Sequence, residues 1–232
     1  MMQDFISRHQ IKLGRDALFA LLREHNLLVR KRKRSTQTTF SKHCFKKYKN
    51  LIRGFEPMAP NLLWVSDITY LRVADGFAYL SLITDAYSKR IMGFSLSKTL
   101  QAESSLKALQ MALSNSKDTS QLIHHSDRGI QYCCNDYTDM LKSRHIQISM
   151  TENGDPLENA IAERVNGILK TELLQEAYRD FEQARTGVAK AIWIYNSLRP
   201  HSSCQMLTPQ VAHQTQGKLK KHWKNYYKQK GG

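Results

Sequence analysis

The 232-residue sequence predicts an α/β domain built on a mixed β-sheet. Between residues 63 and 98 it holds three successive segments rich in β-branched and aromatic residues, which is typical of strands joined as a meander. From residue 99 onward, segments with leucines at helical spacing alternate with short apolar runs. Strands first, and then alternating helices and strands, favour a sheet covered by helices.

The expected elements follow one another along the chain. Strands are expected at 63–73, 76–85, 88–98, 121–127 and 146–150, and helices at 99–115, 132–144, 160–174 and 181–200. Residues 151–159, TENGDPLEN, are rich in Gly, Pro and Asn and are expected to form a loop. Asp85, in LITDAYSKR, is expected in a hairpin turn.

The two ends of the chain differ from this core. Residues 12–29 predict a helix, and a basic run follows it: Arg30, Lys31, Arg32, Lys33 and Arg34. A helix that leads into a basic run suggests a small DNA-contacting head, whereas the alternative is a solvated charge run, and this stretch favours neither. The predicted organisation is a helical head (1–39), a basic linker (40–59), a core (60–212) and a basic tail (213–232) that includes Lys220, Lys221 and Trp223.

Composition narrows the class of protein. A net charge of +15 favours a polyanionic partner, because each neutralised phosphate releases counterions; the alternative is a soluble basic protein without a partner. Hydrophobic residues make up 41% of the chain, which is enough for a core and excludes a disordered chain. The cysteines at 44, 133, 134 and 204 form neither a disulfide framework nor a zinc motif, so we expect reduced thiols and a cytoplasmic protein. No segment resembles a membrane span or a signal peptide, so no membrane partner is expected.

Three carboxylates stand out from their surroundings. Asp67 lies inside an apolar strand, Asp127 closes the run LIHHSD, and Glu163 lies one turn into a helix. Three carboxylates can hold two divalent cations that stabilise the attacking and leaving oxygens of a phosphodiester. Each also has a structural interpretation: a hydrogen-bonded strand acid, a turn residue, and a first-turn helix acid, respectively.

Longer motifs surround these acids. WVSDITY, HHSDRGIQY and SMTENGDPLENAIAERVNGILKTE resemble the catalytic core of insertion-sequence transposases of the OrfB type, and YNSLRPHSSCQMLTP is similar to the segment that follows. Between Asp127 and Glu163 lie 35 residues, the spacing of that branch. The resemblance covers residues 63–209, and residues 11–34 are similar to the helix-turn-helix-like region. It implies a ribonuclease-H-like fold with a mixed five-stranded sheet and a small helical head.

The resemblance also implies chemistry. Asp67, Asp127 and Glu163 become the DDE triad that binds two Mg²⁺ or Mn²⁺ ions, in a transposase or its catalytic subunit that cleaves DNA and transfers strands. Asn159, Glu163 and Lys170 lie near one helix face by their spacing, so Lys170 and Asn159 are expected to contact DNA, although Lys170 could be an ordinary exposed lysine. Arg128 could reach a phosphate. His124 and His125 are not assigned as metal ligands, because hard cations prefer carboxylates.

Some features depart from the pattern. His43 and Cys44 are isolated and cannot form the zinc domain of the retroviral relatives, and the head is shorter than usual. The expected partners are double-stranded DNA, further copies of the chain in a homo-oligomer, and an upstream helix-turn-helix protein as a fusion partner, in the bacterial nucleoid. Two alternatives stay open: a nuclease of the same fold, and a truncated copy that binds DNA without catalysis. The position of the third acid and Lys170 argues against the first, and the three intact acids argue against the second.

Overall fold

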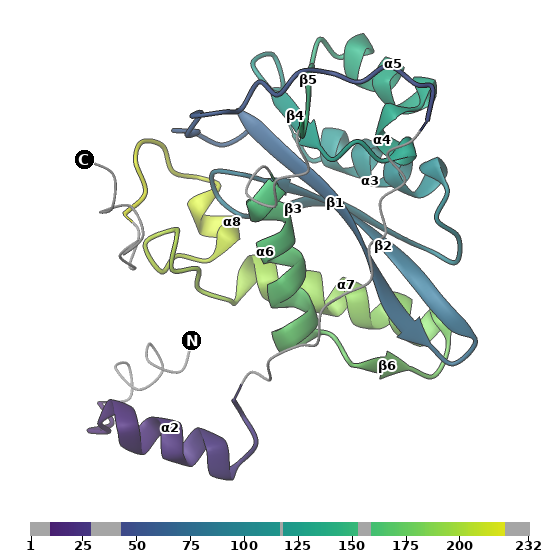
Figure 1. The fold of residues 1–232 in the computed structure, drawn as a ribbon. Coiled ribbons are helices and arrows are strands. Elements are labelled where there is room, and N and C mark those ends of the chain that lie inside the picture. Colours follow the sequence, from purple (N-terminus) through teal and green to yellow (C-terminus); the bar gives the residue numbers. More distant parts are fainter. Residues whose placement is uncertain (1–9, 29–42, 117, 153–158, 221–232) are drawn as a thin grey trace. The chain divides into compact units, whose positions relative to one another are not determined.

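The computed structural model describes residues 10–28, 43–116, 118–152 and 159–220, and it divides the chain into two units, 1–37 and 38–232 (Figure 1). The second unit is built on a sheet with the order β3-β2-β1-β4-β5. These strands are β1 (Leu63–Val73), β2 (Gly76–Asp85), β3 (Ile91–Ser97), β4 (Ile123–Ser126) and β5 (Gln147–Met150). The first three form an antiparallel meander, whereas β4 and β5 run parallel to β1. The predicted mixed sheet is confirmed.

A sixth strand extends the predicted sheet. β6 (Ala177–Tyr178) pairs in parallel with the end of β1, at Arg72 and Val73. Two residues are too few to produce a strand pattern in the sequence, so this pairing was not expected.

Helices cover both faces of the sheet. They are α3 (Ala102–Ser114), α4 (Ile130–Cys133), α5 (Asn135–Ser143), α6 (Ala160–Ile168), α7 (Phe181–Ser197) and α8 (Pro209–Ala212). One buried cluster joins α3, α4 and α5 to one face, and its largest member is Trp64. A second cluster joins α6 and α7 to the other face through residues such as Leu80 and Val188 (Figure 1). The strands of this sheet are therefore covered on both faces, as in other doubly covered sheets.

Two helices differ from their predicted bounds. The helix predicted at 132–144 is divided, because Cys134 is extended (φ −63°, ψ 152°) between α4 and α5. The helix predicted at 160–174 is α-helical only to Ile168, and a π-helical turn, η2 (Leu169–Leu173), completes it. A single-residue break and a change of helix type leave no clear mark in the spacing of apolar residues.

Asp85 ends β2 and begins the β2–β3 turn, as expected. It is fully buried, and its carboxylate accepts hydrogen bonds from the Ser88 N–H and hydroxyl (both 2.7 Å) and from the Asn61 N–H (2.8 Å). These donors satisfy the buried charge, so Asp85 stabilises the turn.

The first unit contains α2 (Arg15–Glu24), which lies inside the predicted helix. None of its side chains is buried, and Phe19 and Leu21 are 44% and 45% exposed. The basic run Arg30–Arg34 lies outside the described residues, as do Lys221 and Trp223 of the tail; Lys220 is exposed. In the described part of the chain, no helix combines the length and the hydropathy that crossing a bilayer requires.

Candidate active site

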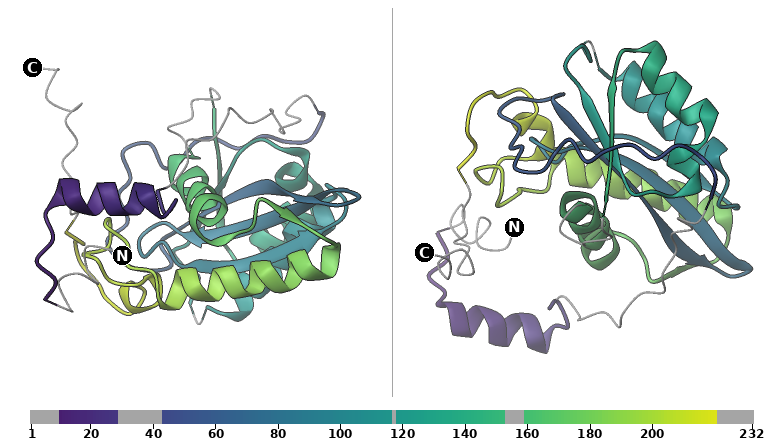
Figure 2. Two further views of the ribbon diagram at one scale, coloured as in Figure 1. Left: turned by 90° about the horizontal axis from the view of Figure 1, so that it is seen from below. Right: turned by 45° about the horizontal axis from the view of Figure 1, so that its top comes forward.

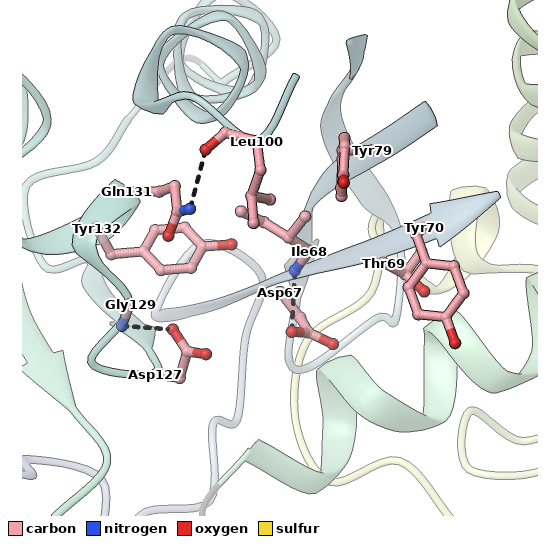
Figure 3. A pocket seen from close by; sticks show the side chains of 10 residues that line it. All are labelled: Asp67, Ile68, Thr69, Tyr70, Tyr79, Leu100, Asp127, Gly129, Gln131 and Tyr132. Atoms are coloured by element: carbon pink, nitrogen blue, oxygen red, sulfur yellow. Dashed lines mark hydrogen bonds between the residues drawn. The ribbon is translucent and has the colours of Figure 1, made fainter. Parts of the chain in front are cut away.

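Asp67 and Asp127 come together because their strands are neighbours. β1 and β4 are parallel, with Val65 opposite His125. Two residues further along each strand direction stand Asp67, inside β1, and Asp127, directly after β4. Both line one pocket, and Figure 3 shows their carboxylates directed into the same space.

Hydrogen bonds fix both carboxylates. The Asp67 Oδ1 accepts from the Ile68 N–H at 2.9 Å, and its Oδ2 accepts from the Asn166 Nδ2 at 2.6 Å. The Asp127 Oδ1 accepts from the Gly129 N–H at 2.9 Å. A Cβ at Gly129 would lie 3.0 Å from that Asp127 oxygen, so the turn after β4 is tight enough to favour glycine.

The pocket raises the pKa of one of its two aspartates. The pKa of Asp67 is raised from 3.8 to about 7, first by burial, then by the negative charge of Asp127, and to a smaller extent by Glu163. The bonds from Asn166 and Ile68 oppose this rise without cancelling it. Two carboxylates thus repel each other in a partly desolvated space, and a cation between them would relieve that repulsion.

Glu163 approaches this pair from α6. The Glu163 side chain is mostly exposed, but the part of it that is buried raises the pKa of its carboxyl group. Asn166, one turn further along α6, is buried and holds Asp67, so the same helix carries the third acid and a contact to the first. Within the residues that the structure describes, no three His, Cys, Asp or Glu side chains converge as a preformed metal site. The structure therefore joins the two aspartates and leaves Glu163 at the margin.

The residues present fit a hard divalent cation. The donors are carboxylate oxygens, which Mg²⁺ and Mn²⁺ prefer. The Oδ1 of Asn166 is buried without a hydrogen-bond partner beside Asp67, which adds a neutral oxygen to the donor set. The raised pKa of Asp67 also means that cation binding must displace a proton near neutral pH.

The residues expected to contact DNA occupy different environments. Lys170 lies in η2, and its Nζ is 4.4 Å from the ring centroid of Tyr70, a residue that lines the pocket. Arg128 is half-buried next to Asp127. Asn159 is buried at the start of α6, where its Nδ2 donates to the Ser66 carbonyl at 3.1 Å. This position favours a role in docking α6 onto β1 over a direct DNA contact.

Asn166 is the site residue that the sequence did not reveal to us. A signal existed, since Asn159, Glu163 and Asn166 recur at intervals of four and three, and Lys170 follows four residues later. These intervals form one polar stripe along a helix. The contact between Asn166 and Asp67 itself joins residues 99 positions apart and has no local signature.

The two histidines before Asp127 serve the fold. His124 Nε2 lies 2.7 Å from the Ser66 hydroxyl and 2.9 Å from the Tyr137 hydroxyl, and burial lowers its pKa to about 3. His125 Nδ1 lies 2.8 Å from the Ser149 hydroxyl. Both side chains are buried and hydrogen-bonded, which supports their exclusion from the ligand set.

Comparison with known proteins identifies the family of the chain. Two family models, both described as Integrase core domain, match residues 57–156 and 144–209. The chain is 34% identical to the "Insertion element IS600 uncharacterized 31 kDa protein" of Shigella sonnei, over 90% of this chain and 78% of that protein. It is also 34% identical to "Transposase InsF for insertion sequence IS3A" of Escherichia coli (strain K12), over 82% and 67%.

A solved structure shows the same fold. The catalytic core domain of HTLV-2 integrase, in complex with magnesium, superposes with a TM-score of 0.53 at 20% identity, over 68% of this chain and 99% of that one. This likeness confirms the ribonuclease-H-like fold. The matched families, the level of identity and its coverage lead to one conclusion: the chain belongs to the insertion-sequence transposases with an integrase core domain, and it acts in DNA transposition.

Proposed function

We propose that this transposase cuts DNA at the ends of its mobile element and joins the resulting 3′-OH to a target strand by direct transesterification. Asp67, Asp127 and Glu163 would hold two Mg²⁺ or Mn²⁺ ions. The observation that carries the proposal is that Asp67, inside β1, and Asp127, directly after the parallel strand β4, line one pocket, with each carboxylate fixed by hydrogen bonds.

The cations would activate the attacking oxygen and stabilise the leaving oxygen of the phosphodiester. The protein contributes orientation. Asn166 and the Ile68 N–H hold the two oxygens of Asp67, and the Gly129 N–H holds Asp127. These contacts prevent the ligands from rotating away, as outer-shell contacts do in other metal sites.

Cations of the protein would bind the DNA backbone around this pocket. Lys170 stands at its edge over Tyr70, and Arg128 follows Asp127 directly. Arg30, Lys31, Arg32, Lys33 and Arg34 would bind DNA from the head. We further propose that the chain acts as a homo-oligomer, because two element ends must be held together, and that an upstream helix-turn-helix protein serves as its fusion partner.

The experiment is nicking and strand joining on supercoiled plasmid, in Mn²⁺ or in EDTA. Wild type is compared with Asp67→Asn and Glu163→Gln, which keep side-chain shape and remove the charge that holds a cation. Matched controls are Asp75→Asn and Glu176→Gln, which change exposed acids outside the pocket. Mn²⁺-dependent products that disappear in both site variants and persist in both controls would support the triad.

Other outcomes would contradict the proposal. Equal nicking by wild type and the site variants would remove the triad assignment. Hydrolysis of an RNA–DNA hybrid or of branched DNA, without any joined product, would favour the nuclease of the same fold. DNA binding without metal-dependent cleavage would favour a copy that only binds.

A further inference from the structure

Residues 43–53, here named the strap, lie against the core, although the sequence predicted a basic linker over residues 40–59. The strap contains no helix or strand. The Lys49 carbonyl accepts from the Met150 N–H at 3.4 Å, and the Leu51 N–H donates to the Ser149 hydroxyl at 2.9 Å. Figures 1 and 2 show it as the dark blue coil that passes along β5.

Side chains anchor the strap as well. Phe45 and Tyr48 pack against the buried cluster beneath α3 and α5, and Ile52 packs against a third cluster around Leu63. The Asn50 N–H donates to the Glu152 carboxylate at 3.0 Å. Backbone and side-chain contacts thus hold the whole segment in one position on the core.

The strap is linked to the residues on either side of Asp127, directly at Arg128 and through Ser149 at His125. His43 Nε2 donates to the Arg128 carbonyl at 2.8 Å, one residue after Asp127. Ser149, which accepts from the strap, also hydrogen-bonds His125, two residues before Asp127. The orientation of the second acid therefore depends on contacts that the strap makes.

The strap also carries exposed positive charge in the residues that follow His43. Lys46, Lys47, Lys49 and Arg53 are exposed. The Arg53 guanidinium lies 3.7 Å from the half-buried Glu152 carboxylate, and an ion pair with one exposed partner contributes little to stability. The pKa of Cys133 is raised to about 11, first by burial and then by the charge of Asp127, and the charge of Lys47 opposes this rise. The charges of Lys47 and Asp127 therefore both act on the Cys133 thiol.

We propose that the strap binds the DNA backbone beside the scissile phosphate, and that His43 is a positioning residue that fixes the turn after Asp127. This inference rests on the proposed function of the pocket. Exposed lysines on a flexible linker lose side-chain and backbone freedom when they bind phosphate. Lysines on a segment already held by hydrogen bonds lose less, so they contribute more to affinity.

The first test is DNA binding in EDTA, measured on a duplex over a range of salt concentrations. The strap variant is Lys46→Gln/Lys47→Gln/Lys49→Gln, and the charge-matched control is Lys107→Gln/Lys190→Gln/Lys218→Gln, from exposed positions elsewhere. We expect the strap variant to bind at least about tenfold more weakly at low salt, with a salt slope reduced by about 2 to 3. Equal losses in the two variants would overturn the proposal, because net charge alone would explain them.

The second test concerns His43. His43→Phe keeps a ring next to Phe45, whose centroid lies 5.7 Å away, and removes the donor, whereas His43→Gln keeps a donor. The measurement is the rise of the melting temperature with added Mn²⁺. We expect His43→Phe to need about tenfold more Mn²⁺ for the same rise, and His43→Gln to restore the wild-type response. Identical responses of the three proteins, or equal defects in both variants, would overturn the positioning role.

The two proposals fail separately. If the plasmid assay removes the triad assignment while the strap variant alone loses affinity, the strap stands as a DNA contact without that chemistry. If the triad holds and the strap variant binds like its charge-matched control, only the strap proposal falls.

Discussion

At the scale of single residues, the environment of Asp67 disfavours an ionised carboxylate. Its pKa rises from 3.8 to about 7 because it is buried and faces the charge of Asp127. Without a cation, the folded protein must either keep a proton on this acid or bear an unfavourable charge. The unpaired burial of this charge costs stability, and the cation of the proposed function would relieve that cost.

This environment predicts how stability depends on pH. Between about pH 4 and pH 7, Asp67 is ionised in the unfolded chain and protonated in the folded one, so the unfolded state binds fewer protons. The free energy of unfolding therefore falls as pH rises through this window and stays reduced above it. Asp67→Asn removes this dependence, and we expect the variant to match wild type near pH 4 and exceed it at pH 8 by at most about 4 kcal/mol. Urea unfolding in EDTA at several pH values measures it, and a difference independent of pH would contradict it.

The hydrogen bond from Asn166 should determine how far the pKa of Asp67 is raised. Asn166→Leu keeps the size of the side chain and removes the bond at 2.6 Å that lowers the pKa of Asp67. We expect the midpoint of the pH profile for Mn²⁺-dependent nicking to move to higher pH, and the rate to fall about 10- to 100-fold. The control is Asn115→Leu, which removes a similar bond, to the Met92 carbonyl, at the end of α3. An equal shift in the control would show that the effect is not specific to the site.

The residue scale also shows which parts of the site the sequence reveals. Asp67 and Asp127 were recognisable because a charged residue in an apolar strand is costly unless it has a function. Asn166 was not, and Asn159 was expected only as a DNA contact, since a polar residue near the start or middle of a helix is ordinary in a sequence. Their roles come from tertiary contacts with Ser66 and Asp67.

At the scale of elements, the close packing of α3 on β3 is a sharp constraint. A Cβ at Gly93 would lie 2.1 Å from the Ala108 carbonyl oxygen and 2.7 Å from the Ala112 backbone nitrogen. These are backbone atoms, so no side-chain rotation relieves the clash. We expect Gly93→Ala to reduce the free energy of unfolding by about 3 kcal/mol, measured by urea denaturation.

Gly167 provides the opposite case in the same assay. It lies inside α6, and an added Cβ would meet no atom within 4 Å. Alanine costs less conformational entropy than glycine in a helix, so Gly167→Ala should stabilise the protein by up to about 1 kcal/mol. If both variants destabilised equally, the packing argument for Gly93 would lose its support.

Helices and strands were predicted correctly where a sequence pattern extended over many residues. The prediction failed where one or two residues determine where an element begins or ends. β1 and α7 each carry a repeated pattern over more than ten residues, and both lie where the sequence placed them. The division at Cys134 depends on one extended residue, and β6 depends on its pairing with Arg72 and Val73. Such features are set by the surrounding fold, which local spacing does not encode.

At the scale of the whole molecule, basic charge is distributed over both units. Residues 1–37 contain nine basic and three acidic side chains, so they hold a large part of the net charge of +15. None of the described residues 10–28 belongs to a buried cluster of the core. The first unit therefore carries basic charge but adds no described residue to the core, whereas the buried clusters all lie in the second unit.

This division predicts the behaviour of a chain that begins at residue 38. Because α2 buries no side chain, we expect its loss to leave the melting temperature within about 2 °C of the full chain. Because the deleted part is strongly basic, we expect the affinity for duplex DNA at low salt to fall and its salt dependence to become shallower. Calorimetry and a salt titration of binding measure the two effects on the same samples. A melting temperature lowered by more than about 5 °C would mean that the head contributes to the fold of the core, and unchanged DNA binding would mean that the core, including the strap, carries the DNA contacts alone.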